Sequence, residues 1–413
     1  MALVKPFSAV RPAPELASRV AALPYDVYNR KEAKEVALRD PLSFLNIDRA
    51  ESNLPDDVDT YDPKVYAKAK ELLDARIADG TYLTDPADCY YVYELIMDGR
   101  SQTGIVACAS IDDYVSGVIK KHENTREEKE LDRIRHVDTC NAQTGPIFLA
   151  YRSNSVISGI MTAYQKTAPL YAFTADDGIT HSVWRIADKK DVEAIKAAFA
   201  GIDSIYIADG HHRAASAVKV GLKRRQENPG YTGTEEYNFF LSVLFPEDQL
   251  MILPYNRVVK DLNGLSEAEF FAKISEHFTV SEIGTEPYAP ARKGTFGMFL
   301  SGKWYALTIR DELAAIDDPV DSLDVALLQD YLLGPVLGIG DPRTDKRIDF
   351  IGGIRGLKEL ERRVSLDMTV AFSMYPTQIT ELFSVADAGL LMPPKSTWFE
   401  PKLRSGLFLH KLS

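Results

Sequence analysis

Short runs of apolar residues recur along the chain, separated by polar turn residues, in a pattern typical of β-strands. The runs at residues 89–97 and 103–110 are joined by a dipeptide that favours a two-residue hairpin turn. Hairpins are expected around Asp98-Gly99, Asp177-Gly178 and Ser301-Gly302. Further strands are expected at residues 146–151, 204–208, 237–245 and 250–259.

Helices are indicated where apolar residues recur every three or four positions. In a helix beginning near Pro63, Val65, Ala69 and Leu73 share one face, and Gly80 is placed to end it. Other helices are expected at residues 127–141, 156–165, 191–200, 214–220 and 267–277, with two or three more in the last hundred residues. This mixture of hairpins and helices predicts an α+β fold rather than a regular alternating α/β sheet.

The length of 413 residues favours two domains over one elaborated domain. We place a core with insertions at residues 1–260 and a C-terminal α+β portion at residues 261–413. The pattern locates the boundary only loosely, between about residues 260 and 315.

Composition narrows the functional classes. The net charge of −12 argues against a nucleic-acid binder, although a local basic groove remains an alternative. Three cysteines without close spacing favour neither a disulfide framework nor a Cys-rich zinc site. No run approaches the roughly 20 apolar residues that a membrane helix needs, so we expect a cytoplasmic protein without a membrane partner.

The strongest candidate for a functional site is the segment "IADGHHRAASA", in which an acid, a glycine, two histidines and an arginine follow one another. It places Asp209, Gly210, His211, His212 and Arg213 where an apolar strand gives way to a small-residue helix. A helix N-terminus leaves backbone N–H groups free and favours an anion, and arginine binds phosphate bidentately. Asp209 would oppose an anion, so we assign it to a hydroxyl or to Mg²⁺. The five residues together predict a phosphate cradle, and the alternative is a polar helix cap.

Other polar residues are candidates on weaker grounds. Asp26 lies in "LPYDVYN", where it is either a turn former or an acid; Asn29 is expected to be a helix cap. The charged run "KKHENTREEKELDR" contains His122, Glu123 and Arg133, and its alternative is a solvated helix face. The loop "PPKSTWFEPK" offers two hydroxyls and two cations to an anion, namely Lys395, Ser396, Thr397 and Lys402.

Asp-Gly-His-His-Arg followed by small helical residues resembles the phosphate-binding loop of the ParB/sulfiredoxin-like superfamily. Within that superfamily, this loop sequence is most similar to that of the free serine kinases. The resemblance implies a mixed-sheet core whose loop holds nucleotide phosphates. Over nearly the whole chain, "KPFSAVRP" with "LPYDVYN", "HENTREEKELDR", "IADGHHRAASA", "LPYNRVVKDL" and "MPPKSTWFEPKLRSG" are similar to the domain of unknown function 1015. That resemblance favours the functional over the structural interpretation of His122, Glu123 and Arg133, and also of the loop residues Lys395, Ser396, Thr397 and Lys402. It further implies a link to serine metabolism.

These observations predict nucleotide-dependent phosphotransfer to or from a small hydroxyl metabolite, with serine or phosphoserine favoured. Gly210, His211, His212 and Arg213 would hold phosphate, with Arg133, Lys395, Ser396, Thr397 and Lys402 as further phosphate ligands. Asp209 would hold Mg²⁺ or orient the hydroxyl, and Asp26 or Glu123, with His122 nearby, would act as base. ATP or ADP is the expected co-substrate. The alternatives are a phosphoserine phosphatase and a non-enzymatic nucleotide-binding regulator; sulfiredoxin-like redox repair lacks a cysteine in the loop.

Overall fold

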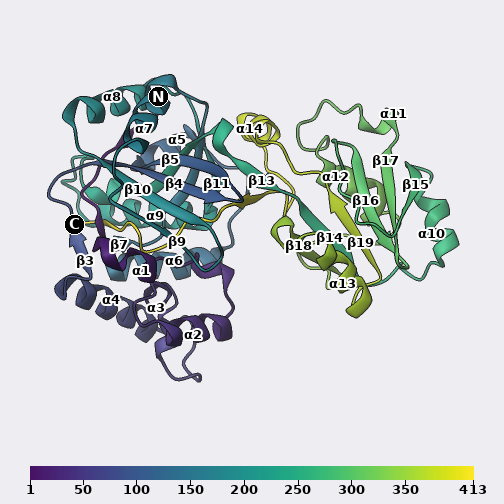
Figure 1. The fold of residues 1–413 in the computed structure, drawn as a ribbon, viewed down its shortest axis with the longest axis horizontal. Coiled ribbons are helices and arrows are strands. Elements are labelled where there is room, and N and C mark those ends of the chain that lie inside the picture. The colour runs from purple at the N-terminus through teal and green to yellow at the C-terminus, as the bar shows by residue number, and fades with distance from the viewer. The chain divides into compact units, whose positions relative to one another are not determined.

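The computed structural model describes residues 1–413 and divides them into two compact units (Figure 1). The first unit comprises Met1–Leu250 together with Pro401–Ser413, and the second comprises Met251–Glu400. The second unit therefore begins about ten residues before the expected boundary at residue 260. The last residues of the chain, Pro401–Ser413, belong to the first unit and not to the C-terminal portion. The reason is strand pairing: β13 (Met251–Leu253) pairs with β20 (Trp398–Glu400), so the second unit begins and ends on neighbouring strands.

The first unit is built on a nine-stranded mixed sheet. Antiparallel pairs dominate, but β11 runs parallel to β6 and β12 runs parallel to β8. The strand order is β6 (Ile119–Lys120), β11 (Ile205–Asp209), β8 (Ile147–Tyr151), β12 (Phe239–Pro246), β5 (Arg100–Ser110), β4 (Tyr90–Met97), β10 (Thr180–Ile186) and β9 (Tyr171–Thr174), with β1 (Val4–Lys5) pairing with β5. The prediction of an α+β fold is confirmed.

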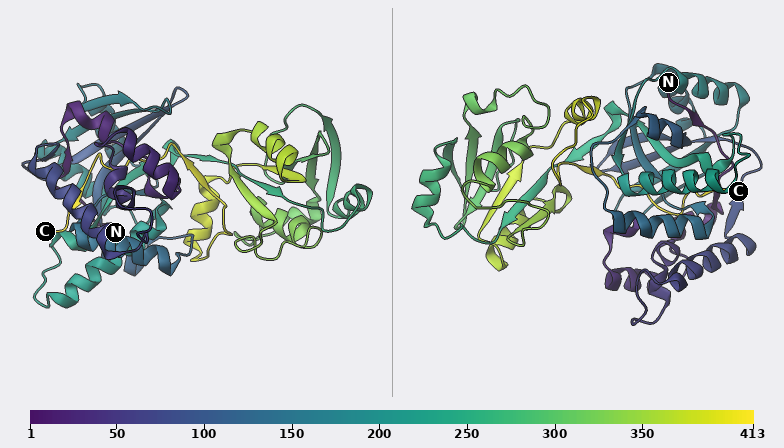
Figure 2. Two further views of the ribbon diagram at one scale, coloured as in Figure 1. Left: turned by 90° about the horizontal axis from the view of Figure 1, so that it is seen from below. Right: turned by 180° about the vertical axis from the view of Figure 1, so that it is seen from behind.

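Helices α7 (Ser155–Gln165), α8 (Lys189–Ala200) and α9 (His211–Glu227) cover one face of this sheet. Ile105, Ala107 and Ile207 from the strands pack against Phe199 and Ala217 from the helices in one apolar cluster. Helix α6 (Glu127–Cys140) lies beside α9, as Figure 2 shows. The short α5 (Ile111–Ser116) follows β5.

The opposite face is rich in aromatic side chains and is contacted by the C-terminal segment. Tyr91 and Tyr93 project from β4 toward Phe408, with ring centroids 5.2 Å and 6.0 Å away. His410 lies in β21 (His410–Lys411), which pairs with β7 (Ala142–Gln143). The tail of the chain is thus part of the core of the first unit.

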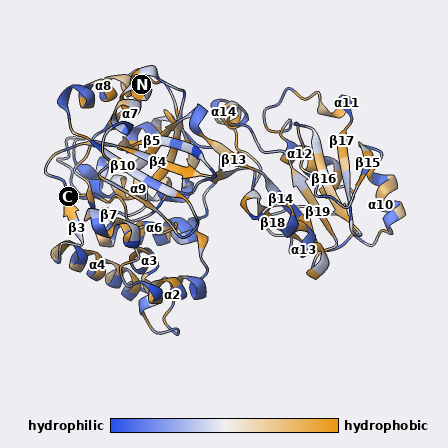
Figure 3. Ribbon diagram, in the orientation of Figure 1, coloured by the Kyte–Doolittle hydropathy of each residue, from blue (hydrophilic) through white to orange (hydrophobic).

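The N-terminal helices form a second cluster, in which apolar residues of α3 and α4 pack on Tyr82, Cys140 and Leu409. Their outer surfaces mix hydrophilic and hydrophobic residues (Figure 3). As expected, Asn29 caps α2 in a reciprocal capping box with Glu32. The elements are β2 (Val10–Pro12), α1 (Ala17–Val20), α2 (Arg30–Arg39), α3 (Leu45–Asp48), α4 (Pro63–Ala78) and β3 (Tyr82–Thr84), with 3-10 turns at Pro14–Leu16, Tyr25–Val27 and Ala50–Asn53.

The second unit has a six-stranded antiparallel sheet packed with short helices. Its strand order is β15 (Phe278–Gly284), β17 (Lys303–Ile309), β16 (Thr295–Leu300), β19 (Val370–Met374), β14 (Tyr255–Val259) and β18 (Ile348–Gly352). The helices are α10 (Glu267–Ile274), α11 (Asp311–Ala314), α12 (Asp324–Leu328), α13 (Lys358–Leu366) and α14 (Ile379–Asp387). Residues 250–259, expected as one strand, form two strands interrupted at Pro254, because proline cannot donate to a ladder.

The three predicted hairpins are present, at β4–β5, β9–β10 and β16–β17. Asp98 and Gly99 both adopt positive φ, as the predicted turn requires. None of the helices is both long enough and apolar enough to cross a membrane.

Candidate functional site

The predicted cradle lies where β11 ends and the 17-residue helix α9 begins. Gly210 is the N-cap of α9 with φ of 93°, in the left-handed region that favours glycine. No side chain of the N-cap residue accepts from the first backbone N–H groups of the helix, which therefore remain without a capping partner. The combination of an uncapped N-terminus and a glycine at the turn suits a bound anion.

Asp209 is the last residue of β11 and lies between two cations. Its Oδ2 is 3.6 Å from Nη2 of Arg213 and 3.5 Å from Nζ of Lys402. Burial alone would raise the pKa of Asp209, but Lys402 and Arg213 outweigh it and lower the pKa to about 2. The carboxylate is therefore ionised, and the pair of cations gives this turn a net positive charge.

Arg213 folds back over the turn that precedes it. It donates from Nη1 to the backbone carbonyl of Pro146. A Cβ on Gly210 would lie 3.0–3.1 Å from three atoms of the Arg213 guanidinium, so glycine makes room for this conformation. At Gly145 a Cβ would meet Oγ of Ser405 at 3.3 Å, whereas its distance of 3.6 Å from Nη1 of Arg213 is an ordinary van der Waals contact.

His211 and His122 form a buried imidazole pair. Their ring centroids are 4.5 Å apart in an edge-on arrangement, and the backbone N–H of His122 donates to Nε2 of His211 at 3.5 Å. Burial lowers the pKa of His122 to about 4 and, with the adjacent His122, lowers the pKa of His211 well below its usual value. Both rings are neutral at pH 7. Glu123 lies nearby, with Oε2 3.7 Å from Nδ1 of His211.

His212 faces a different set of groups. Its Nε2 accepts from the backbone N–H of Arg126 at 3.0 Å, which leaves the proton on Nδ1. Burial lowers the pKa of His212, and the carboxylates of Glu130 and Asp26 partly oppose that effect. Asp26 lies exposed in the 3-10 turn Tyr25–Val27. The structure therefore brings Asp26 into electrostatic range of the cradle.

The charged run on α6 is not a solvated face at every position. Glu130, Asp132 and Arg133 are buried because this side of α6 packs against α9 and α4. Asp132 accepts from the hydroxyl of Tyr66 at 3.0 Å and from Nε and Nη2 of Arg133 at 2.9 Å and 2.8 Å. Burial alone would lower the pKa of Arg133, but Asp132 raises it. Arg133 is thus a fixed cation inside the first unit.

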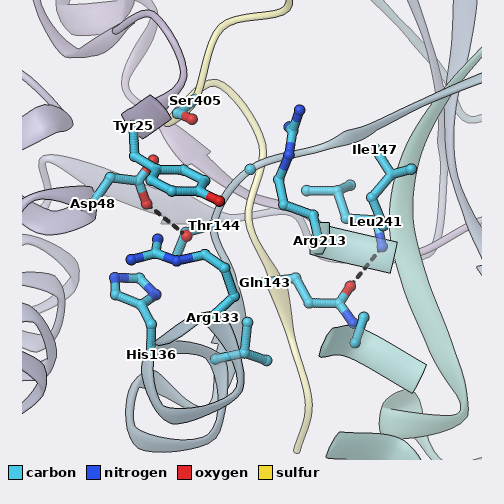
Figure 4. Close-up of a pocket in the computed structure, with 13 residues that line it drawn as sticks. Tyr25, Asp48, Arg133, His136, Gln143, Thr144, Ile147, Arg213, Leu241 and Ser405 are labelled. Carbon is cyan, nitrogen blue, oxygen red and sulfur yellow. Dashed lines mark hydrogen bonds between the residues drawn. The ribbon is translucent and has the colours of Figure 1, made fainter. Parts of the chain in front are cut away.

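A cavity adjoins the cradle and shares Arg213 with it (Figure 4). The cavity proper has a volume of about 30 Å³, and the wider space between its lining residues, about 440 Å³, includes open solvent. The guanidinium carbon of Arg133 lies 4.0 Å from the centroid of the Tyr25 ring above it. Among the other residues lining it are Asp48, His136, Gln143, Thr144, Gly145 and Ser405.

Sequence reasoning missed Asp48, Thr144 and Ser405. Asp48 and Thr144 are ordinary polar residues outside any motif, and the three residues come from distant segments that only the fold brings together. Ser405 lies within the "MPPKSTWFEPKLRSG" motif, which is the only sequence signal that pointed toward it.

Lys395, Ser396 and Thr397 belong to the second unit, whereas Lys402 belongs to the first. The hydroxyl of Ser396 donates to Pro393 at 2.5 Å, and its carbonyl accepts from Thr377 at 2.8 Å. Lys395 places its ammonium 5.3 Å from the centroid of the Tyr255 ring, within the same unit. The assignment of these three residues to a phosphate stays a prediction.

The structure offers no protein cage for a metal ion, because no group of three or more His, Cys, Asp or Glu side chains is arranged to hold one. Mg²⁺ usually takes one or two carboxylates and completes its shell with water and phosphate oxygens. The ionised Asp209 fits that role only together with a nucleotide. The three cysteines are buried, and burial raises their pKa values, to about 12 for Cys140, which disfavours a thiolate nucleophile.

The model of the family described as "Protein of unknown function (DUF1015)" matches residues 4–326, which is well over half of the chain. The chain belongs to the DUF1015 family. The match spans the cradle, the buried imidazole pair and most of the cavity of this DUF1015 protein. No curated protein sequence matches it.

Several solved structures are distantly similar to this DUF1015 protein. Free serine kinase in complex with AMP has 15% identity and a TM-score of 0.36, over 74% of this chain and 91% of that one. A conserved hypothetical protein from Pyrococcus furiosus has 15% identity and a TM-score of 0.34, over 74% and 94%. SbnI with a C-terminal truncation, from Staphylococcus aureus, has 13% identity and a TM-score of 0.36, over 71% and 82%. At these TM-scores the similarity carries no functional argument.

Proposed function

We propose that this DUF1015 protein transfers a phosphoryl group between a nucleotide and a small hydroxyl metabolite. The observation that carries the proposal is Asp209, ionised between Lys402 and Arg213 at the uncapped N-terminus of α9. Two cations and a row of free N–H groups surround one carboxylate there, which leaves a net positive site for phosphate oxygens. Phosphoryl transfer needs this kind of positioning and charge neutralisation more than covalent chemistry.

The neutral imidazoles of His211 and His212 support the same conclusion. A neutral ring donates one hydrogen bond without adding charge, so it can orient a phosphate oxygen while the two cations neutralise it. Because burial keeps both pKa values low, the rings remain in that form at neutral pH. We assign the phosphate contacts to Gly210, His211, His212, Arg213 and Lys402.

The transfer step is a displacement at phosphorus. The hydroxyl oxygen of the acceptor forms a bond to the terminal phosphorus, and the bond from that phosphorus to the bridging oxygen of the nucleotide breaks. The nucleotide leaves with the electron pair of the broken bond, and the hydroxyl proton moves to a carboxylate. Glu123, 3.7 Å from His211, and Asp26, in electrostatic range of His212, are the two candidates for that base.

Serine or phosphoserine is the favoured metabolite, because the amino-acid sequence of the loop at Asp209–Arg213 resembles that of free serine kinases. On the same ground we propose that the first unit has a ParB/sulfiredoxin-like core. Mg²⁺ would be held by Asp209 together with nucleotide phosphates, and it would supply further neutralisation of the transferred group.

The experiment is a turnover assay of the full chain with ATP or ADP and L-serine, and in the reverse direction with O-phosphoserine, each with and without Mg²⁺. We expect nucleotide-dependent turnover that Glu123→Gln or Asp26→Asn abolishes while nucleotide binding persists. Release of inorganic phosphate from O-phosphoserine without nucleotide would instead indicate a phosphatase. Nucleotide binding without turnover of any pair would contradict an enzyme and favour a nucleotide-binding regulator.

A further inference from the structure

The cavity beside the cradle is lined by two buried, opposite charges that interact through space, since Asp48 helps to raise the pKa of Arg133, but that do not form a direct ion pair. Asp48 is 4% exposed and Arg133 is 7% exposed, both line the cavity, and they form no ion pair with one another. A buried charge is normally paired, because removing an ion from water without a partner costs several kcal/mol. Figure 4 shows both side chains gathered around Tyr25 on one side of the cavity.

Asp48 has unused acceptor capacity. Its Oδ1 accepts from the hydroxyl of Thr144 at 2.8 Å, and the structure supplies no hydrogen-bond donor to Oδ2. Because a carboxylate accepts several hydrogen bonds when it is satisfied, this oxygen is suited to a donor from a ligand. A cationic donor fits best, since it would also neutralise the buried charge.

Arg133 has unused donor capacity. Its contacts with Asp132 come from Nε and Nη2, whereas Nη1 has no carboxylate partner. The guanidinium lies over the ring of Tyr25, with its carbon 4.0 Å from the ring centroid. Ser405 is 3% exposed and also lines the cavity with its hydroxyl. A ligand carboxylate would be matched by these two donors.

We propose that this cavity binds a small α-amino acid as its zwitterion, with the α-ammonium on Asp48 and the α-carboxylate on Arg133. The open acceptor oxygen of Asp48 and the open Nη1 donor of Arg133, whose other side is paired with Asp132, suit a ligand that carries both signs close together, and an α-amino acid is the smallest common compound that does so. Ser405 supplies a further hydrogen bond.

The cavity also limits the size of the side chain and directs it. A Cβ on Gly145 would lie 3.3 Å from Oγ of Ser405 and 3.6 Å from Nη1 of Arg213, so there is no spare room at this wall. Arg213 lines both the cavity and the phosphate cradle. In this proposal the side-chain hydroxyl of the bound amino acid lies on the Arg213 side of the cavity, next to the cradle. The assignment of this ligand as the phosphoryl acceptor rests on the proposed function, whereas zwitterion binding does not.

The test is titration calorimetry of the full chain with L-serine, with ethanolamine, which lacks the carboxylate, and with 3-hydroxypropanoate, which lacks the ammonium, each with and without ADP. We expect L-serine to bind at least about tenfold more tightly than either analogue, because each analogue lacks one of the two charge-assisted hydrogen bonds. Equal affinities, or no binding of L-serine in either condition, would overturn the proposal.

Asp48→Asn provides the matched variant, because it keeps the shape and the contact with Thr144 but removes the charge. We expect it to weaken L-serine about tenfold or more and to leave ADP affinity unchanged. Asp138→Asn, on the same helix as Arg133 but paired with Lys223 and Arg224, is the control and should bind both ligands normally. Unchanged L-serine affinity in Asp48→Asn would contradict the assignment. If that variant does not fold, the analogue series on the unaltered chain decides.

The two proposals fail separately. ADP binding without any preference for L-serine over its two analogues would contradict this inference but not the proposed phosphate cradle. L-Serine binding without nucleotide binding would contradict the proposed phosphotransfer but would support the amino-acid site.

Discussion

Lys402 of the C-terminal segment places its ammonium 3.5 Å from the carboxylate of Asp209 at the end of β11. The two residues are far apart in the sequence and meet because residues 401–413 return to the first unit. Ser405 fixes this return by exchanging backbone hydrogen bonds with Ala22, at 2.8 Å and 3.1 Å. The tail thus supplies one of the two cations that keep Asp209 ionised.

Replacing Lys402 should raise the pKa of Asp209. In Lys402→Met only Arg213 and the weaker effect of His211 remain to oppose burial, so we expect the pKa to rise from about 2 toward the ordinary value or above it. Titration of the side-chain carboxyl by carbon NMR measures this directly. Lys411→Met, in the same segment, is the control and should leave Asp209 unchanged. An unaltered pKa in Lys402→Met would show that the contact does not govern the charge at the cradle.

Gly210→Ala should damage both stability and anion binding. The positive φ of 93° is unfavourable for alanine by roughly 1–2 kcal/mol, and the new Cβ would displace the Arg213 guanidinium. Gly233→Ala separates the two effects, because Gly233 has a similar φ of 89° with open space around its Cβ position. We expect similar losses of stability in both variants, measured by urea unfolding, but reduced nucleotide affinity only in Gly210→Ala. Equal nucleotide affinity in the two variants would contradict the role given to the Arg213 conformation.

The buried histidines should make the first unit less stable in mild acid. The pKa of His122 is about 4 in the folded chain, below its unfolded value near 6.5, so the unfolded chain binds a proton first as the pH falls. The stability is complete above pH 6.5 and declines down to about pH 4, by about 3 kcal/mol for this residue. The free energy of unfolding of His122→Gln, measured across this range, should depend less steeply on pH than that of the parent. The difference in slope should correspond to roughly one proton taken up on unfolding. An identical slope in the variant and the parent would refute the assignment.

Truncation after Glu400 should destabilise the first unit and spare the second. The removed segment contributes the backbone pairing of Leu409 with Val10, the β21 strand and the contact of Arg404 with Asp177. Because Phe408 and His410 also leave the aromatic face, we expect a loss of several kcal/mol, measured as a lower thermal transition of that unit. Removal of Ser413 alone should have little effect. A first unit that unfolds at its original temperature without residues 401–413 would contradict this architecture.

The sequence predicted elements best where local chemistry decides them. The hairpins at Asp98-Gly99 and Asp177-Gly178 and the helix from Pro63 formed as expected, because turn and capping preferences act over a few residues. The strand-to-helix turn at Gly210 was predictable for the same reason.

What the sequence could not predict depends on contacts between distant segments. Nothing in the local pattern shows that Glu130 pairs with Lys219 rather than with water, or that Asp48 meets Thr144 beside Arg133. The domain division was placed too late because the pairing of β13 with β20 joins residues about 150 positions apart. The phosphate cradle was therefore predictable from a sequence motif, whereas the cavity could be found only in the fold.

The central claim is that the turn from Asp209 to Arg213 binds a phosphoester, and calorimetric titration of ATP, ADP and AMP into the full chain with Mg²⁺ tests it most directly. We predict measurable binding that Arg213→Ala weakens at least about tenfold, because a charge-assisted bidentate contact is lost, while Arg362→Ala on the exposed face of α13 binds normally. Flat titrations for all three nucleotides, or unchanged affinity in Arg213→Ala, would contradict the account.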